Sequence, residues 1–187
     1  MNKMLKQTLQ KIESLLKEIF PELLDSLNPS ATESQIQALE DALQVPLPED
    51  VKTLYRWHDG ERNTVGLFFG MSFLSIEEAL EEWKIWAEIA AEGDSVLDSS
   101  IASVPSGFIK ENYANRLYLP ISADGGGNNI VVDLDPDEKG QYGQVINSGR
   151  DEEMRYVIAS SVSKWMEFVL HQLQSNNFII EQEEDTK

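Results

Sequence analysis

The chain has 187 residues, 41% apolar and 26% charged, which is typical of one globular domain. It has no cysteine and only two histidines, His58 and His171, which excludes disulfides, thiol nucleophiles and zinc sites built from cysteines or several histidines. A formal net charge of −18 disfavours binding to nucleic acids or anionic membranes and favours a basic protein partner. The alternative is that this charge serves solubility alone.

Apolar residues recur every third or fourth position at the N-terminus and predict an amphipathic helix. The stripe consists of Leu5, Leu9, Ile12, Leu16 and Ile19. We predict that residues 1–27 pack on the rest of the domain, with a membrane-surface or partner helix as the alternative. The sequence has no run of about 18 apolar residues and no secretory signal at its start, so we expect a cytoplasmic protein without a membrane-spanning helix.

Two further helices are predicted before residue 60. Thr32 and Gln35 have capping-box spacing, in which each side chain bonds a backbone N–H of the first helical turn. The following helix extends from residue 49 to about residue 58 and ends at Asp59-Gly60, where glycine suits a left-handed terminal residue. Residues 64–69 are rich in β-forming side chains and predict a strand.

A second capping box, formed by Ser75 and Glu78, begins a long helix with one strongly acidic face. We predict that this face binds the partner. The expected binding residues are Glu77, Glu78, Glu81, Glu82 and Trp86, with Asp59 and Glu61 expected to adjoin them. Two simpler explanations remain: the helix dipole favours acids in the first turn, and tryptophans at helical spacing often belong to a core.

The second half of the chain predicts a sheet followed by a helix. Strands are expected near residues 117–121, 129–134, 144–147 and 155–158, and their short connections require antiparallel pairing. Residues 95–115 are expected to be mostly loop, residues 162–173 a helix, and residues 176–187 an acidic tail. The predicted fold class is therefore α+β, with an antiparallel β-sheet and helices packed on one side. Its expected core includes Ile36, Leu39, Leu54, Tyr55, Leu80, Val131, Trp165 and Val169.

The glycine-rich segment Asp124, Gly125, Gly126, Gly127 is predicted to be a structural turn between strands. A phosphate-binding loop is less consistent with the sequence, because a strand follows it instead of a helix and no lysine is present. If Gly126 needs a positive φ, its replacement by valine should lower stability.

No set of residues predicts catalysis, and no cofactor is expected. Asp133, Asp135 and Asp137 alternate as in a calcium loop, but Glu138 and Gln144 occupy positions where an EF-hand has glycine and glutamate. We therefore predict a strand end and turn, with weak metal binding as the alternative. His58-Asp59 has no matching serine in a nucleophile elbow, so a helix end is favoured over half of a catalytic triad.

The order of these segments resembles the SUKH superfamily, named for the yeast Smi/Knr regulators of cell-wall assembly and glucan synthesis and including bacterial relatives. The resemblance covers residues 28–173 and therefore implies one SUKH-like domain over residues 28–175. It rests on Leu39-Glu40, Leu47-Pro48-Glu49-Asp50, Asp59-Gly60, Ser75 with Glu77-Glu78-Ala79, Tyr118-Leu119-Pro120-Ile121, Val132-Asp133-Leu134, Trp165 and Phe168. The family often has Gly-Asp in the glycine turn, whereas Gly127 is followed here by Asn128.

The resemblance implies an α+β fold without established catalytic residues. Bacterial relatives are regarded as immunity proteins that neutralise toxins, many of them nucleases, and fungal relatives are linked to cell-wall synthesis. The main hypothesis is a non-enzymatic acidic module of immunity type that binds a basic protein. The alternatives are a regulator or scaffold in cell-wall and glucan synthesis, and a metal-assisted hydrolase using the Asp133–Asp137 cluster.

Overall fold

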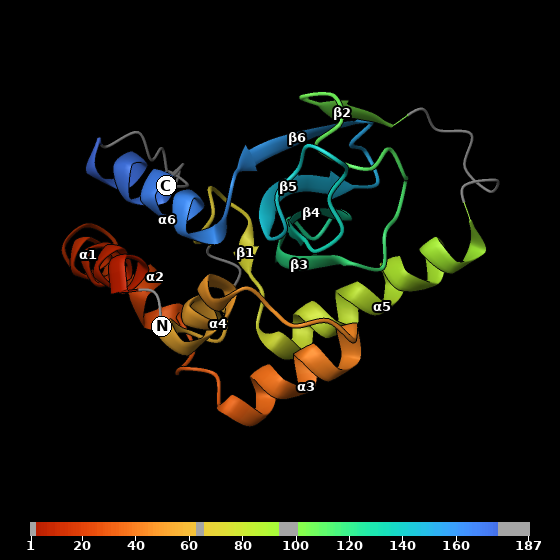
Figure 1. Ribbon diagram of the computed structural model, residues 1–187. Coiled ribbons are helices and arrows are strands. Elements are labelled where there is room, and N and C mark those ends of the chain that lie inside the picture. The colour runs from red at the N-terminus through yellow and green to blue at the C-terminus, as the bar shows by residue number, and fades with distance from the viewer. Residues whose placement is uncertain (1–2, 63–65, 94–100, 176–187) are drawn as a thin grey trace, which may run out of the picture.

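The computed structural model describes residues 3–62, 66–93 and 101–175 (Figure 1). The helices are α1 (Lys3–Ile19), α2 (Pro21–Ser26), α3 (Glu33–Leu43), α4 (Glu49–Trp57), α5 (Ile76–Glu92) and α6 (Val162–Gln174). The strands are β1 (Ser72–Phe73), β2 (Ala102–Val104), β3 (Tyr118–Ala123), β4 (Asn128–Asp133), β5 (Gln144–Gly149) and β6 (Met154–Ala159). The acidic tail expected at residues 176–187 lies outside the described residues. Among the described helices, none has the length and apolar character that crossing a membrane requires.

The strands form a six-stranded sheet in the order β1-β3-β4-β5-β6-β2. This confirms the α+β class. Consecutive strands from β3 to β6 pair antiparallel as expected, but β2 pairs with β6 in parallel, so the sheet is mixed. The short-connection argument did not apply to β2, because some fifty residues of chain separate it from its partner. Within the expected loop, residues 102–104 therefore form an edge strand, and residues 94–100 lie outside the described part.

The main core lies between the helices and one face of the sheet. α1 buries Leu5, Leu9, Ile12 and Leu16 and packs against α6 and α4. Figure 1 shows α1 and α6 side by side at one end of the molecule, with α3 and α5 along the lower side of the sheet. Of the expected core residues, Leu80 alone is half-buried, and it packs at the margin of this core.

The opposite face of the sheet has a smaller apolar cluster, to which no described helix contributes a residue. It contains Ile109, Tyr118, Val131 and Ile146, with Phe108 and Val157 at its edge. Phe108 and Ile109 come from the segment between β2 and β3, so this irregular segment takes the place of a helical layer. The segment is held by hydrogen bonds from Gln144 Nε2 to the Phe108 carbonyl and from Arg155 Nη2 to the Tyr113 carbonyl.

Residues 66–70, shortly before β1, form a compact turn. The prediction of a strand at residues 64–69 is wrong for residues 66–69, while residues 63–65 lie outside the described part. Gly66, Phe69 and Gly70 all have positive φ, which is incompatible with a strand. A side chain at Gly66 would place its Cβ 2.6 Å from the Gly70 Cα, so the turn needs glycine there.

Candidate partner-binding surface

The start of α5 is fixed to two other helices by side-chain hydrogen bonds. Ser75 Oγ accepts from the Glu78 backbone N at 3.3 Å, and the Glu78 carboxylate accepts from the Ser75 backbone N at 2.8 Å, which completes the predicted capping box. Asp59, just after α4, accepts from the Ile76 backbone N at 2.8 Å and from Gln35 Nε2 of α3 at 2.9 Å. Asp59 therefore joins α3, α4 and α5, and both its carboxylate oxygens already have partners within the protein.

The outward face of α5 is a straight acidic row, which we call the α5 stripe. Its members are Glu77, Glu81, Ile85, Glu88 and Glu92, all exposed and spaced by three or four residues. Ile85 is 55% exposed at the middle of this row. Within the described structure, the stripe glutamates form no side-chain hydrogen bond or ion pair with another residue.

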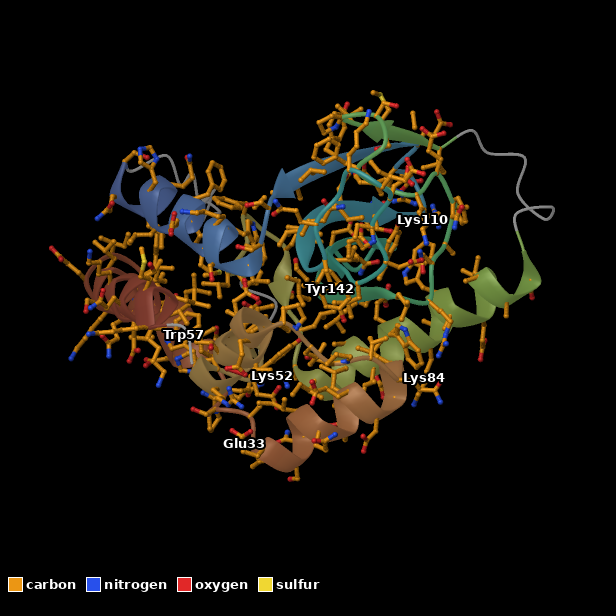
Figure 2. The ribbon with its side chains drawn as sticks, in the orientation of Figure 1. Glu33, Lys52, Trp57, Lys84, Lys110 and Tyr142 are labelled. Atoms are coloured by element: carbon orange, nitrogen blue, oxygen red, sulfur yellow. The ribbon has the colours of Figure 1, made fainter. Side chains whose placement is uncertain are left out.

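The charged residues of α5 are almost all negative. The helix carries six glutamates and a single lysine, Lys84, which is labelled in Figure 2. Elsewhere the acids of neighbouring helices are paired: Lys52 contacts Glu40 at 2.6 Å, and Arg56 contacts Glu33 at 2.7 Å. The Arg56 hydrogen bond and charge hold the pKa of Glu33 below its usual range. In the described residues no ion pair forms along the stripe, although Lys84 lies three residues after Glu81 and four before Glu88, so the net negative potential of the stripe is directed to solvent.

Trp86 does not lie on this surface. It is 8% exposed, and its indole Nε1 donates to Asn129 Oδ1 at 3.0 Å and to Glu82 Oε1 at 3.2 Å. It connects α5 to β4 and also contacts the Tyr113 ring. Trp86 therefore belongs to the interior, the alternative left open by its helical spacing, and Glu82 is partly engaged in holding it.

Glu61 is also internal, at 4% exposure. Its two carboxylate oxygens accept from the backbone N of Gly66 at 2.9 Å and of Leu67 at 3.0 Å. These bonds satisfy amide groups that the turn withdraws from solvent. We therefore remove Glu61 and Trp86 from the expected binding residues.

The glycine segment connects the antiparallel strands β3 and β4. Gly125 and Gly127 have φ of 74° and 98°, whereas Gly126 does not have a positive φ. Asp124 Oδ1 accepts from the backbone N of Gly126 at 2.6 Å and of Asn128 at 3.0 Å. The side-chain hydrogen bond from Asn128 is the main reason that the pKa of Asp124 is lowered. The positions that need glycine for a positive φ are thus Gly125 and Gly127. The condition on which the expected effect of a valine at Gly126 depended, a positive φ there, is not met.

The three alternating aspartates do not converge on a common point. Asp133 is fully buried, accepts from the Asp135 backbone N at 2.9 Å and from Gln144 Nε2 at 2.8 Å, and has its pKa raised to about 6 by burial. Asp135 pairs with Lys110, labelled in Figure 2, and accepts from Asn115 Nδ2. Among the described residues, no group of three or more acidic or histidine side chains could hold a metal ion. The metal-assisted hydrolase therefore has no site in this part of the chain.

His58 lies at the end of α4 and not in a triad. Its Nδ1 bonds the Asn28 carbonyl oxygen, so this nitrogen is the donor. Its Nε2 is buried without a hydrogen-bond partner in the described structure. The Asp59 carboxylate binds Gln35 and Ile76 and not the imidazole. His58 therefore lies at a helix end, as expected. The described contacts do not pair it as a general base with a nucleophile.

These observations define a class of protein: an acidic α+β domain with a charged helix face directed to solvent and no convergent catalytic group in the described residues. The chain belongs to the SMI1/KNR4 family (SUKH-1), whose model matches residues 30–167. This confirms the resemblance seen in the sequence.

Several similar proteins are named as regulators. The chain is 32% identical to "Cell wall biosynthesis/cell cycle regulator smi1" of Schizosaccharomyces pombe, over 95% of this chain and 38% of that protein. It is 29% identical to "Glucan synthesis regulatory protein" of Neurospora crassa, over 93% and 39%. It is 27% identical to "Cell wall assembly regulator SMI1" of Saccharomyces cerevisiae, over 88% and 39%. The chain thus spans about two fifths of the length of these curated relatives.

Proposed function

We propose that this chain is a non-catalytic regulator of cell-wall and glucan synthesis, acting in the cytoplasm by binding a basic protein partner. The names of its relatives support the regulatory process, and they favour it over the immunity function expected from the wider resemblance. The observation that carries the binding mode is the α5 stripe, where glutamates lie in a row without internal partners.

The physical argument for the stripe starts from its energetics. Like charges four residues apart on a helix repel by a few tenths of a kcal/mol per pair, which applies to Glu77 with Glu81 and to Glu88 with Glu92. Lys84, three residues after Glu81 and four before Glu88, offsets part of this repulsion but supplies no reason for the row itself. Glu77 is favoured by the helix N-terminus, but this effect fades within one turn and does not extend to Glu81 or Glu88. A basic partner would relieve the repulsion on binding. Ile85 would supply an apolar contact at the centre of the interface.

The proposal is tested by replacing the chromosomal gene in the native host. We expect deletion to reduce cell-wall β-glucan and to sensitise cells to dyes that stress the wall. Wild-type protein should restore both properties, whereas the double variant Glu77→Lys and Glu81→Lys should not. The matched control is Glu18→Lys and Glu22→Lys, which changes the net charge equally at exposed positions on α1 and α2.

Each outcome decides the proposal when the variants accumulate to equal levels. Loss of complementation by the α5 variant alone supports binding through the stripe. Equal complementation by both variants removes the stripe from the mechanism. A deletion strain with normal β-glucan and normal dye resistance contradicts the regulatory function itself.

A further inference from the structure

A second surface of unusual composition lies on β6. Met154, Tyr156 and Ile158 are 46%, 45% and 40% exposed. Met154 and Tyr156 flank Arg155 in the strand and point to one face of the sheet, while Arg155 is fully buried on the other face; Ile158 lies two residues further along the strand. We call these three residues the β6 strip.

The β6 strip lies on the face of the sheet that helices cover elsewhere. Val157 belongs to the smaller cluster on the opposite face, as does its ladder partner Ile146. Met154 and Tyr156 alternate with Val157 and therefore share the face of the main core. Beyond Val157 the β5–β6 ladder shifts its register, and Ile158 lies exposed at this irregularity, two residues after Tyr156. α6 begins at Val162, beyond the end of β6, and Figure 1 shows it leading away from this strand. This part of the sheet thus lacks its helical layer among the described residues.

Strand addition next to this surface is obstructed. β2 forms the adjoining edge of the sheet, but the Ser103 backbone N points to the Glu111 carboxylate at 3.3 Å and is not free for another strand. Pro105 follows β2 directly and has no N–H to offer. A helix packed across the face fits better. The strip is about 13 Å long at about 3.3 Å per residue, close to the roughly 12 Å between positions i and i+8 of a helix.

The charge beside the strip indicates the chemistry of that helix. The turn before β6 contains Arg150, Asp151, Glu152 and Glu153, one base against three acids. Arg150 lies near Asp151 at 3.6 Å, so it is already partly neutralised. Glu152 accepts from Asn147 Nδ2 at 2.6 Å, and the Asn147 Oδ1 accepts from the Tyr156 backbone N, which places an acid directly beside the strip.

A second copy of this chain is a poorer occupant. Each chain has a formal net charge of −18, and two such chains would bring their acidic turns together. Electrostatic complementarity favours a basic partner over a like-charged one.

We propose that the β6 strip docks a basic amphipathic helix of a partner protein, with the apolar face of that helix on Tyr156 and Ile158 and its lysine or arginine residues toward Glu152 and Glu153. The inference rests on the proposed function as a protein-binding regulator but uses a surface separate from the α5 stripe. Two docking surfaces on one small domain would allow it to bring two segments together.

The test uses the full chain and a synthetic 14-residue peptide of leucine and lysine whose leucines form one helical face. Two peptides serve as controls: a scrambled sequence of the same composition, and an analogue with glutamate in place of lysine. Amide and methyl chemical shifts of the isotope-labelled wild-type protein locate the binding site. We expect the largest shifts at Met154, Tyr156 and Ile158 and in β2, and an affinity that falls with added salt.

Variants then measure the contribution of the strip. Tyr156→Ser with Ile158→Ser should weaken binding by tenfold or more. Met4→Ser, at a 68% exposed apolar position on α1, is the matched control and should leave the affinity unchanged. Circular dichroism checks that the variants remain folded, and the shift map of the wild-type protein does not depend on them.

The alternative outcomes separate this inference from the proposed function. Shifts confined to the α5 stripe, or equal binding by the scrambled or glutamate peptide, overturn docking on the β6 strip and leave the regulatory function intact. Self-association of the wild-type chain that Tyr156→Ser and Ile158→Ser abolish would assign the strip to a second copy. Failure of the proposed function is read separately, from the β-glucan and dye assays of the deletion strain.

Discussion

Glu61 and Glu81 carry the same carboxyl group in opposite surroundings. Glu61 is buried and accepts hydrogen bonds from two backbone N–H groups of a tight turn, whereas Glu81 is exposed in a row of glutamates and has no such contact in the described structure. The net charge of the chain counts the two alike. The comparison shows that an acidic composition combines structural carboxylates with others that the fold does not use, and only the second kind is available to a partner.

The largest effect should come from the buried member of this pair. Glu61→Ala leaves the buried N–H groups of Gly66 and Leu67 without acceptors, each costing about 1–3 kcal/mol, so we expect the free energy of unfolding to fall by about 4 kcal/mol. Urea denaturation measures it, with Glu77→Ala as the exposed control. Equally small decreases in the free energy of unfolding for both variants would show that the buried carboxylate stabilises the fold no more than the exposed one.

Asp133, another buried carboxyl group, tests the same comparison through the dependence of stability on pH. Burial raises its pKa from 3.8 to about 6. Because the folded state binds this proton more tightly than the unfolded state, the stabilisation is complete below the unfolded pKa and is lost as pH rises through about 6. Relative to Asp133→Asn, the wild-type protein should lose up to about 3 kcal/mol over this interval. Parallel stability profiles for the two proteins would contradict the assignment.

The glycine turn should give an intermediate effect. Gly125→Ala and Gly127→Ala force an alanine into positive φ, and each should lower stability by about 1 kcal/mol. Neither added Cβ meets a neighbour closer than 3.6 Å, so strain in the backbone is the main cause. Gly126→Ala is the internal control and should have a smaller effect on the thermal midpoint. A larger loss at Gly126 than at its neighbours would mean that the turn has another conformation.

The smallest effect on stability should come from the α5 stripe. Glu81→Lys is expected to change the free energy of unfolding by less than about 0.5 kcal/mol, as surface substitutions usually do. Its effect should appear in binding: once a partner is identified, association should slow with salt and with this variant, while dissociation changes less. An association rate that is insensitive to both would show that the stripe does not steer the partner.

Much of this fold could be predicted from residue spacing. Capping boxes and apolar periodicity located α3, α5 and α6 and the hairpins of β3 to β6, because these signals are local. β2 could not be found in this way, since three residues gain their strand geometry only from pairing with distant β6. The same limit explains the errors in the site. Nothing local to Glu61 or Trp86 shows that Gly66 or Asn129 will lie beside it, although glycines at positions 66 and 70 do suggest a turn in place of a strand.

The packing of α1 has a practical consequence. The family match begins at residue 30, after α1 and α2, yet α1 buries Leu5, Leu9, Ile12 and Leu16 against α6 and α4. A fragment that begins at the first matched residue but keeps α6 would leave the apolar surface of α6, including Val169 and Leu173, open to water. Such a fragment should aggregate when expressed. Laboratory fragments of this protein should therefore retain the N-terminal helix, whatever boundary a sequence comparison suggests.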